Sequence, residues 1–213
     1  MKTTSIITGI CISLLLASCG GSDEDSDQID IKKNPLGALM KMGKEMEKQA
    51  NETADIMAER RKNGDTLAMP YQELQHFLPE SIEGFTRGEP NGATMNMSGM
   101  SYSSAECNYT GADGAYVRVS LVDYNAAFNL YTAATSIWAA GLSIDTPEEK
   151  TNGFKVNDEI SGWETLKKKS KDVSVVVGAG KRFLITVEAN NQEGTDFAKD
   201  IAVDIAKGGL SSI

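Results

Sequence analysis

The residues from 102 to 124 alternate between apolar and polar side chains, and this alternation constrains the fold more than any other feature of the chain. Two strand-like segments, Tyr102 to Thr110 and Ala115 to Tyr124, are joined by Gly111-Ala112-Asp113-Gly114. A short connection rich in glycine and aspartate is typical of a β-hairpin. In the second segment, apolar and polar residues occupy alternate positions: Val117, Arg118, Val119, Ser120 and Leu121. This pattern predicts a sheet with one buried face and one solvated face.

The rest of this region adds strands and two helices. A strand is expected near Ile82 to Phe85, and a helical period at residues 125–141 predicts a helix. A second amphipathic helix is expected at Phe197 to Ile205, before Gly208-Gly209. Four further strands are expected at residues 154–156, 163–166, 173–177 and 183–187. Tight turns between strands imply antiparallel pairing, so we expect an α+β fold, an antiparallel sheet of about six to seven strands with two packed helices.

A long N-terminal amphipathic helix is predicted at residues 34–64. Asn34 is a suitable N-cap, Pro35 suits the first helical position, and Asn63-Gly64 is a typical stop. The residues that recur at intervals of three and four are mostly apolar: Leu36, Leu39, Gly43, Met46, Ala50, Thr53 and Met57. This narrow stripe either packs on the domain that follows or serves as a stalk or coiled-coil contact.

The first 19 residues have the layout of an export signal. A weakly basic start is followed by a mostly apolar run from Ile6 to Leu16, which is shorter than the roughly 20 residues that span a bilayer. The run ends in Leu16-Ala17-Ser18-Cys19, which resembles the lipobox of bacterial lipoproteins. The resemblance implies that residues 1–18 are removed and that Cys19 becomes the lipidated first residue, which anchors the protein in a membrane.

Residues 19–33 form an acidic segment. Between Gly20 and Asp30 there are five acidic side chains and one apolar side chain, so this segment cannot form a core and is expected to be a disordered tether. Its sequence Ser22-Asp23-Glu24-Asp25 resembles the surface-export signal of Bacteroidota lipoproteins, although an ordinary solvated linker explains it equally well. We therefore expect an outer-membrane lipoprotein that is either periplasmic or surface-exposed.

The chain is thus divided into a signal peptide (1–18), a tether (19–33), an amphipathic helix (34–64) and a globular domain (70–210). The order of elements in the domain, its Leu78-Pro79 to Gly84-Phe85 opening and the lipid anchor resemble the PsbP-like domains of some bacterial lipoproteins. The resemblance is one of architecture, with no specific motif. Many members of that family are non-enzymatic adaptor or assembly proteins, which implies a binding role here.

Composition restricts the partners and the role of cysteine. A formal net charge of -9 and a pI near 4.7 argue against binding to nucleic acid, which requires basic patches. Cys107 is the one cysteine left if the signal is removed and Cys19 is acylated, so no internal disulfide is expected. Because Cys107 lies in an alternating segment, we interpret it as a small buried hydrophobe.

No catalytic motif stands out, and neither an enzyme nor a cofactor is expected. His76 is the single histidine, which excludes a zinc site built from several histidines, and no Gly-x-Ser-x-Gly elbow accompanies it. The acidic pairs Glu148-Glu149 and Asp158-Glu159 lie among turn residues and are expected to be solvated. A deep pocket that joined His76 to carboxylates would be the structural sign of an enzyme, whereas a flat surface would count against one.

Two clusters of one residue type suggest binding. The lysines between residues 167 and 171 are interpreted as a solvated hairpin tip or as a contact for acidic lipid head groups or an acidic partner. Met95, Met97 and Met100 place three thioethers within six residues, and thioethers favour Cu(I). The alternative is a flexible apolar loop or a strand edge, where methionine packs adaptably. Cys107 could add a fourth ligand only if the strands bring it near.

The sequence as a whole predicts a non-catalytic binding or adaptor module that is anchored to the outer membrane through lipid on Cys19. An envelope protein is the expected partner, and nucleic acid is not expected to bind. The alternative is an exported Cu(I)-binding protein that uses Met95, Met97 and Met100.

Overall fold

The structure, a computed structural model, describes residues 35–97, 100–125, 127, 130–132, 134–135 and 143–213. The helices and strands follow one another in this order: α1 (Pro35–Lys62), α2 (Tyr71–Leu74), η1 (Gln75–Phe77), β1 (Thr86–Arg87), β2 (Asn91–Met97), β3 (Met100–Thr110), η2 (Ala112–Gly114), β4 (Tyr116–Asp123), β5 (Ser143–Asp145), β6 (Glu149–Lys155), β7 (Ile160–Lys167), β8 (Asp172–Ala179), β9 (Phe183–Ala189), α4 (Asp196–Lys207) and η3 (Leu210–Ser212).

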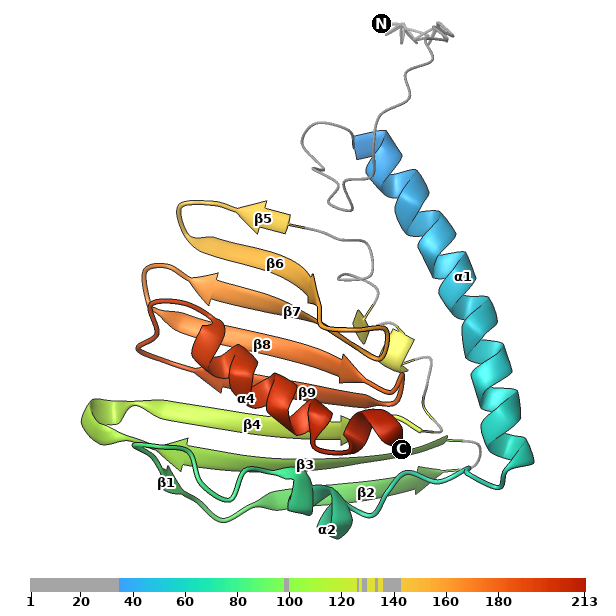
Figure 1. Ribbon diagram of the computed structural model, residues 1–213, viewed down its shortest axis with the longest axis horizontal. Coiled ribbons are helices and arrows are strands. Elements are labelled where there is room, and N and C mark those ends of the chain that lie inside the picture. The colour runs from blue at the N-terminus through green and yellow to red at the C-terminus, as the bar shows by residue number, and fades with distance from the viewer. Residues whose placement is uncertain (1–34, 98–99, 126, 128–129, 133, 136–142) are drawn as a thin grey trace, which may run out of the picture.

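The nine strands in the described part of the chain belong to one antiparallel sheet (Figure 1). The order across the sheet is β1-β3-β4-β9-β8-β7-β6-β5, and β2 pairs with β3 along the same edge as β1. Most neighbours are consecutive hairpins. The exceptions are the short β1–β3 pair at the edge and the β4–β9 pair, which joins the N-terminal strands to the C-terminal strands in the middle of the sheet. This long-range pair brings together residues that lie far apart in the sequence.

The buried face of the sheet follows from the alternation in its central strands. In β3, β4, β8 and β9, every second side chain is buried, and the register places those side chains on one face. The fully buried aliphatic residues on this face are Val117, Val119, Leu121, Val175, Val177, Ile185 and Val187. Their burial supplies the main apolar stabilisation of the domain.

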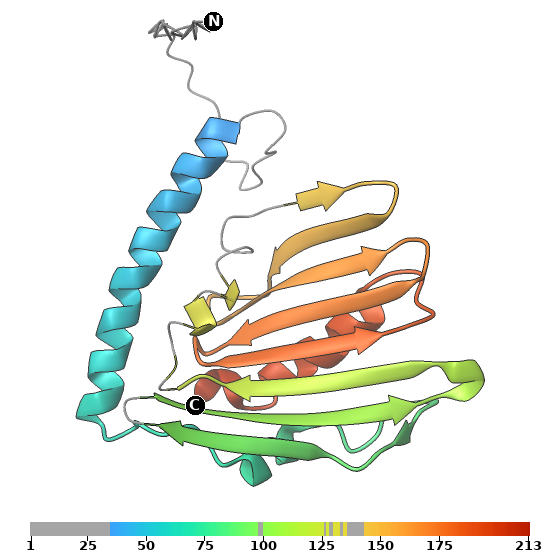
Figure 2. The same cartoon turned by 180° about the vertical axis from the view of Figure 1, so that it is seen from behind.

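Helix α4 covers the buried face, and the opposite face of the sheet carries no long helix among the described residues (Figures 1 and 2). The inner side of α4 is built mainly from small residues: Ala198, Ala202, Val203, Ile205 and Ala206. Small side chains let the helix lie close to β8 and β9. Phe197 extends the contact by stacking on Phe85, with 6.0 Å between the ring centroids.

The predicted α+β fold, with six to seven strands and two packed helices, is wrong. The sheet has nine strands, the fold is mostly β, and α4 is the one long helix among the described elements that packs on the sheet. The strand count was too low because β1, β2 and β5 carry almost no buried side chains, so they lack an apolar alternation. Of the helix predicted at 125–141, residues 130–132, 134 and 135 are described and are helical.

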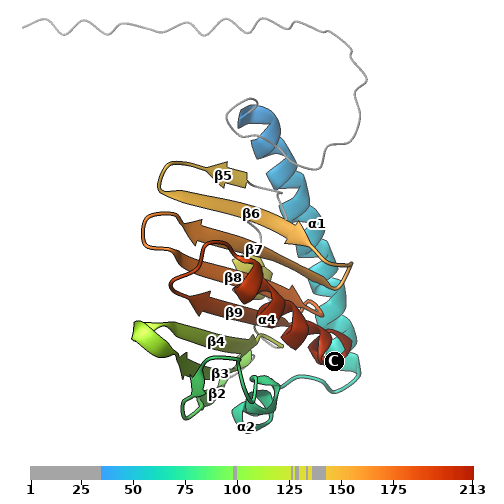
Figure 3. The same cartoon turned by 60° about the vertical axis from the view of Figure 1, so that its left-hand side comes forward.

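Helix α1 lies beside the strand ends and does not form a layer of the domain (Figures 1 and 3). None of its residues belongs to the buried core formed by the described part of the chain. Leu36, the first residue of the predicted apolar stripe, is 68% exposed, and Met40 of the same helix is 62% exposed. Of the helices described, none is long and apolar enough to cross a membrane. The predicted signal peptide and tether, including Cys19, lie outside the described residues.

Candidate functional site

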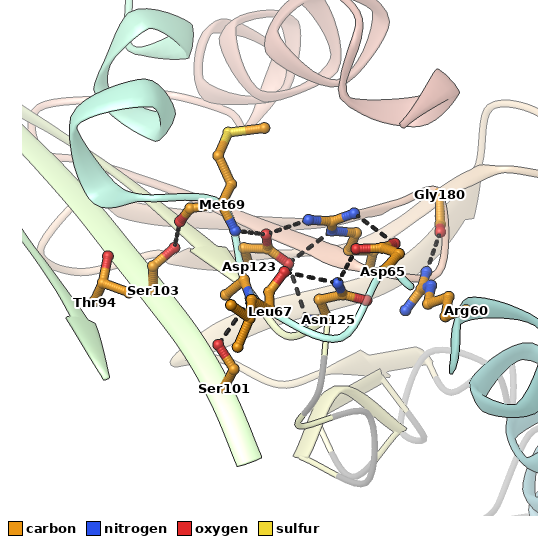
Figure 4. A network of polar contacts seen from close by, with 12 residues as sticks. Arg60, Asp65, Leu67, Met69, Thr94, Ser101, Ser103, Asp123, Asn125 and Gly180 are labelled. Atoms are coloured by element: carbon orange, nitrogen blue, oxygen red, sulfur yellow. Dashed lines mark hydrogen bonds and ion pairs between the residues drawn. The ribbon is translucent and has the colours of Figure 1, made fainter. Parts of the chain in front are cut away.

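A buried ion pair lies where the long-range strand pair β4–β9 ends (Figure 4). Arg182, just before β9, donates from Nε and Nη2 to the two carboxylate oxygens of Asp123, at 2.9 and 2.7 Å. The Asp123 side chain is fully buried and that of Arg182 is 6% exposed. The backbone N–H groups of Met69 and Asn125 also donate to Asp123, at 2.7 and 2.9 Å. These four hydrogen bonds offset the desolvation of the carboxylate.

The same pair holds the connection between α1 and the sheet. Arg182 Nη1 lies 3.2 Å from Asp65 Oδ2, and Asn125 Nδ2 donates to the other Asp65 oxygen and to the Leu67 carbonyl. At the end of α1, Arg60 Nη2 donates to the Gly180 carbonyl at 3.5 Å. The pKa of Arg60 is lowered, mainly by burial and secondly by the nearby positive charge of Arg182. We call Arg60, Asp65, Asp123, Asn125 and Arg182 the clamp.

Beyond the clamp, the chain from Ala68 to Tyr71 is bonded to the core-facing side of the β2–β3 hairpin, and Figure 4 shows the bonds at Ser101 and Ser103. The Ala68 N–H donates to Ser101 Oγ at 2.8 Å, and Ser103 Oγ donates to the Met69 carbonyl. The Tyr71 N–H donates to Thr94 Oγ1 at 2.9 Å. These bonds continue the attachment from the clamp to the edge of the sheet, so the whole connection is a structural element.

An open groove lies between α4 and the segment from His76 to Glu83. Its volume is about 550 Å³. Its apolar lining includes four large side chains that are buried or half-buried, and we call these the floor: Phe77, Phe197, Ile201 and Ile205. The charged lining residues are all acidic: Glu80, Glu83 and Asp204. Among the described residues no lysine or arginine lines the groove, so it offers an apolar floor with a negatively charged rim. We call this the α4 groove.

His76 lines the same groove, but it does not form a catalytic arrangement there. It is exposed, and within the described ranges no hydrogen bond joins it to a carboxylate. No group of three or more His, Cys, Asp and Glu side chains is placed to hold a metal ion in the part of the chain that the structure describes. The groove brings His76 to the same open surface as Glu80, Glu83 and Asp204.

Cys107 is a buried side chain on the core face of β3. Its thiol donates to the Gly88 carbonyl, with 3.4 Å between Sγ and the oxygen. Tyr109, two residues along the same face, donates to the Pro79 carbonyl at 2.6 Å. Burial raises the pKa of Tyr109 to about 12. This environment fits the predicted role of Cys107 as a small buried residue.

The lysine cluster lies at the β7–β8 turn, and acidic partners surround it. Lys168 Nζ is 2.6 Å from Asp145 Oδ1, and Lys169 Nζ is 3.5 Å from Glu148 Oε1. Lys171 pairs with Glu193. Because these three lysines already have carboxylate partners, the turn is a mixed-charge surface and not a strongly basic patch.

Met95, Met97 and Met100 lie at the end of the β2–β3 hairpin, and the register brings them together. Met97 is directly opposite Met100, and Met95 lies two residues from Met97 on the same strand. The structure thus places the three methionines of the predicted cluster in one hairpin, whereas the sequence analysis predicted neither the clamp nor the α4 groove. One signal for the clamp was available: Asp123 continues the buried series Val117, Val119 and Leu121 in β4. A carboxylate in that register requires a buried cation as its partner.

No family model matches the chain, and no curated protein matches it. Among solved structures, an uncharacterised protein from Mycobacterium smegmatis, the Rv0999 ortholog, is similar with 10% identity and a TM-score of 0.32. The alignment covers 66% of this chain and 95% of that chain. This likeness is too distant to carry an argument about fold or function.

Proposed function

We propose that the protein is a lipid-anchored lipoprotein of the outer envelope that binds another envelope protein through the α4 groove, without catalysis. The groove is the single observation that carries this proposal. Phe197 and Ile201 present partly exposed apolar surface along one helix, the buried Ile205 lies beside them in the lining, and no element among the described residues covers the groove. Apolar surface with a polar rim is the usual composition of a protein interface.

The charges on the rim define the partner. Glu80, Glu83 and Asp204 would repel an acidic segment and attract a basic one. The apolar floor selects a segment that also has large apolar residues on one side. The partner is therefore a basic, amphipathic segment of an envelope protein, held by the floor and steered by the rim.

The anchor and α1 set the position of this groove. Lipid on Cys19 holds the chain to the membrane, and the acidic tether separates the membrane from α1. The 28 residues of α1 extend for about 42 Å. The clamp then fixes the end of α1 to the sheet, so the domain is presented at the end of a stalk.

Reversal of the rim charge tests the groove. Glu80→Lys combined with Glu83→Lys should reduce recovery of the partner in chemical cross-linking from intact cells by at least about tenfold, because like charges then face each other. Glu89→Lys is the matched control, since Glu89 is an exposed glutamate of the same region that does not line the groove. Equal recovery of the same partner with the double variant and the control would contradict the proposal.

Replacement of Cys19 tests the anchor separately. The Cys19→Ala protein cannot carry the lipid and should move from the membrane fraction to the soluble fraction, whereas Cys107→Ala should stay in the membrane fraction. Retention of Cys19→Ala in the membrane fraction would contradict the lipid anchor. It would not affect the proposal for the groove, which the charge reversal tests separately.

A further inference from the structure

The three methionines at the end of the β2–β3 hairpin share one face of the sheet. In β3, Ser101 and Ser103 are buried, so Met100 lies on the opposite face. Met97 is paired with Met100, and Met95 is two residues from Met97, so both lie on that face as well. Directly opposed Cβ atoms in an antiparallel pair are about 5 Å apart, and diagonal neighbours are about 7 Å apart. Three flexible thioether side chains can meet over that spacing.

These side chains are exposed. Met95, Met97 and Met100 are 45%, 59% and 38% exposed, and none belongs to the buried core. Packing therefore does not account for their presence side by side. Strand β2 also contains no charged residue in its sequence Asn-Gly-Ala-Thr-Met-Asn-Met, so no carboxylate or ammonium group of that strand competes with the thioethers.

The backbone beneath the methionines is held from the other face. Asn96 and Thr94 lie on the core side of β2, where Asn96 Oδ1 accepts a bond from Ser101 Oγ and Thr94 Oγ1 accepts one from the Tyr71 N–H. These bonds link the two strands at the hairpin end and attach them to the segment that follows the clamp. The register places the three side chains on one side, and the bonds on the other side hold the backbone that carries them, which favours a preorganised site.

The chemistry of three neutral sulfur atoms selects the ligand. Thioethers are soft and favour Cu(I), whereas Zn²⁺, Mg²⁺ and Ca²⁺ prefer thiolate, imidazole or oxygen ligands. Cys107 is not a fourth ligand. It is buried on the opposite face of β3 and lies seven residues from Met100, which is about 23 Å along an extended strand.

We propose that Met95, Met97 and Met100 form a three-thioether site that binds one Cu(I) ion on the open face of the sheet. The site is independent of the α4 groove, which lies beside α4 on the other face, so either proposal can fail alone. The ion is bound and released without a change in its oxidation state. The Met-rich surface therefore has a function that does not depend on a protein partner.

The test is a competition titration under oxygen-free conditions. The full lipidated protein, purified in detergent, competes for Cu(I) with a chelator that changes colour when it binds the ion. We expect one Cu(I) per chain. The combined variant Met95→Leu, Met97→Leu and Met100→Leu should bind on the order of 100-fold more weakly, because even outer-shell changes cost a metal site 10–100-fold. Leucine preserves the size of each side chain, and thermal unfolding checks that the variant is folded.

Matched controls separate this site from other sulfur atoms. A variant with Met40, Met46 and Met57 of α1 changed to leucine removes the same number of thioethers and should bind Cu(I) normally. Cys107→Ala should also bind normally. The proposal is overturned if the wild-type protein does not compete with the chelator, if the hairpin variant binds as well as wild type, or if binding is lost with Cys107→Ala.

Discussion

Asp123 shows how one residue can decide the attachment of two distant segments. Its carboxylate accepts bonds from Arg182 on one side and from the Met69 N–H on the other, and it is completely buried. A buried carboxylate with every bond satisfied is tolerated, but the same carboxylate without its cation is strongly destabilising. The contribution of Arg182 to stability therefore depends on Asp123.

Arg182→Ala should lower the free energy of unfolding by about 3–5 kcal/mol, because it leaves Asp123 buried without its cation. Arg118 is the control, since its contact with Glu188 at 3.3 Å is exposed. Arg118→Ala should cost about 0–1 kcal/mol. Urea unfolding of both variants checks this, and similar losses in the two would contradict a dominant role for the buried pair.

Alkaline pH should destabilise the protein through its buried tyrosines. Burial raises the pKa of Tyr109 from an ordinary value of 10.0 to about 12, so the folded protein holds this proton more tightly than the unfolded chain. The stabilisation is complete below about pH 10 and is lost as the pH rises toward about 12. Burial also raises the pKa of Tyr131 and of Tyr124, which adds to the same loss.

Urea unfolding at a series of pH values above 9 measures this effect. Tyr109→Phe should be less stable at neutral pH, because the bond to the Pro79 carbonyl is lost, and its stability should fall less steeply between about pH 10 and about pH 12. An unchanged slope in Tyr109→Phe would show that Tyr109 does not carry the alkaline loss.

At the scale of elements, Gly162 has no side chain, which leaves room for the ring of Phe154 to lie against strand β7. A Cβ atom at Gly162 would lie 2.7 Å from Phe154 Cζ and would also collide with the Val176 carbonyl oxygen. Gly162→Ala should therefore lower the free energy of unfolding by about 1–3 kcal/mol. Gly43 in α1 is the matched control, because a Cβ atom at that position would meet nothing within 4 Å, and Gly43→Ala should be neutral or stabilising by up to about 1 kcal/mol. Equal effects of the two changes in thermal unfolding would contradict this role of Gly162.

The strands that the sequence predicted well are those that bury every second side chain. Strands β3, β4, β8 and β9 have this pattern, and their apolar alternation was visible in the sequence. Strand β2 was missed because all but one of its residues are exposed, and its pairing with β3 holds it in the sheet. Its order comes from tertiary hydrogen bonds that single-sequence patterns do not record.

The sites were predictable only where their residues are close in sequence. Met95, Met97 and Met100 form one hairpin, so their grouping was expected and the register explains it. The clamp joins Asp65 and Arg182, which are 117 residues apart and meet only because β4 pairs with β9. The α4 groove likewise needs the helix and the segment 76–83 to pack side by side, which no local pattern encodes.

At the scale of the whole molecule, the proposed attachment and the proposed binding surfaces are separate. Helix α1 leaves the domain beside the strand ends (Figures 2 and 3). The α4 groove lies beside the helix that covers one face, and the register puts the three methionines on the other face. Attachment through the N-terminus therefore leaves both surfaces free.

The central claim is that the α4 groove binds a basic segment of an envelope protein in the cell. The most direct test places a photo-reactive amino acid at position 201, in the floor of the groove. Intact cells are illuminated, and the cross-linked peptides are then identified by mass spectrometry. We predict cross-links to a basic, amphipathic segment of a membrane-associated protein. These cross-links should be absent when the probe replaces Glu89, and they should be lost when Glu80→Lys and Glu83→Lys are combined with the probe at position 201. Equal cross-linking from positions 201 and 89, or cross-links that survive the charge reversal, would contradict the claim.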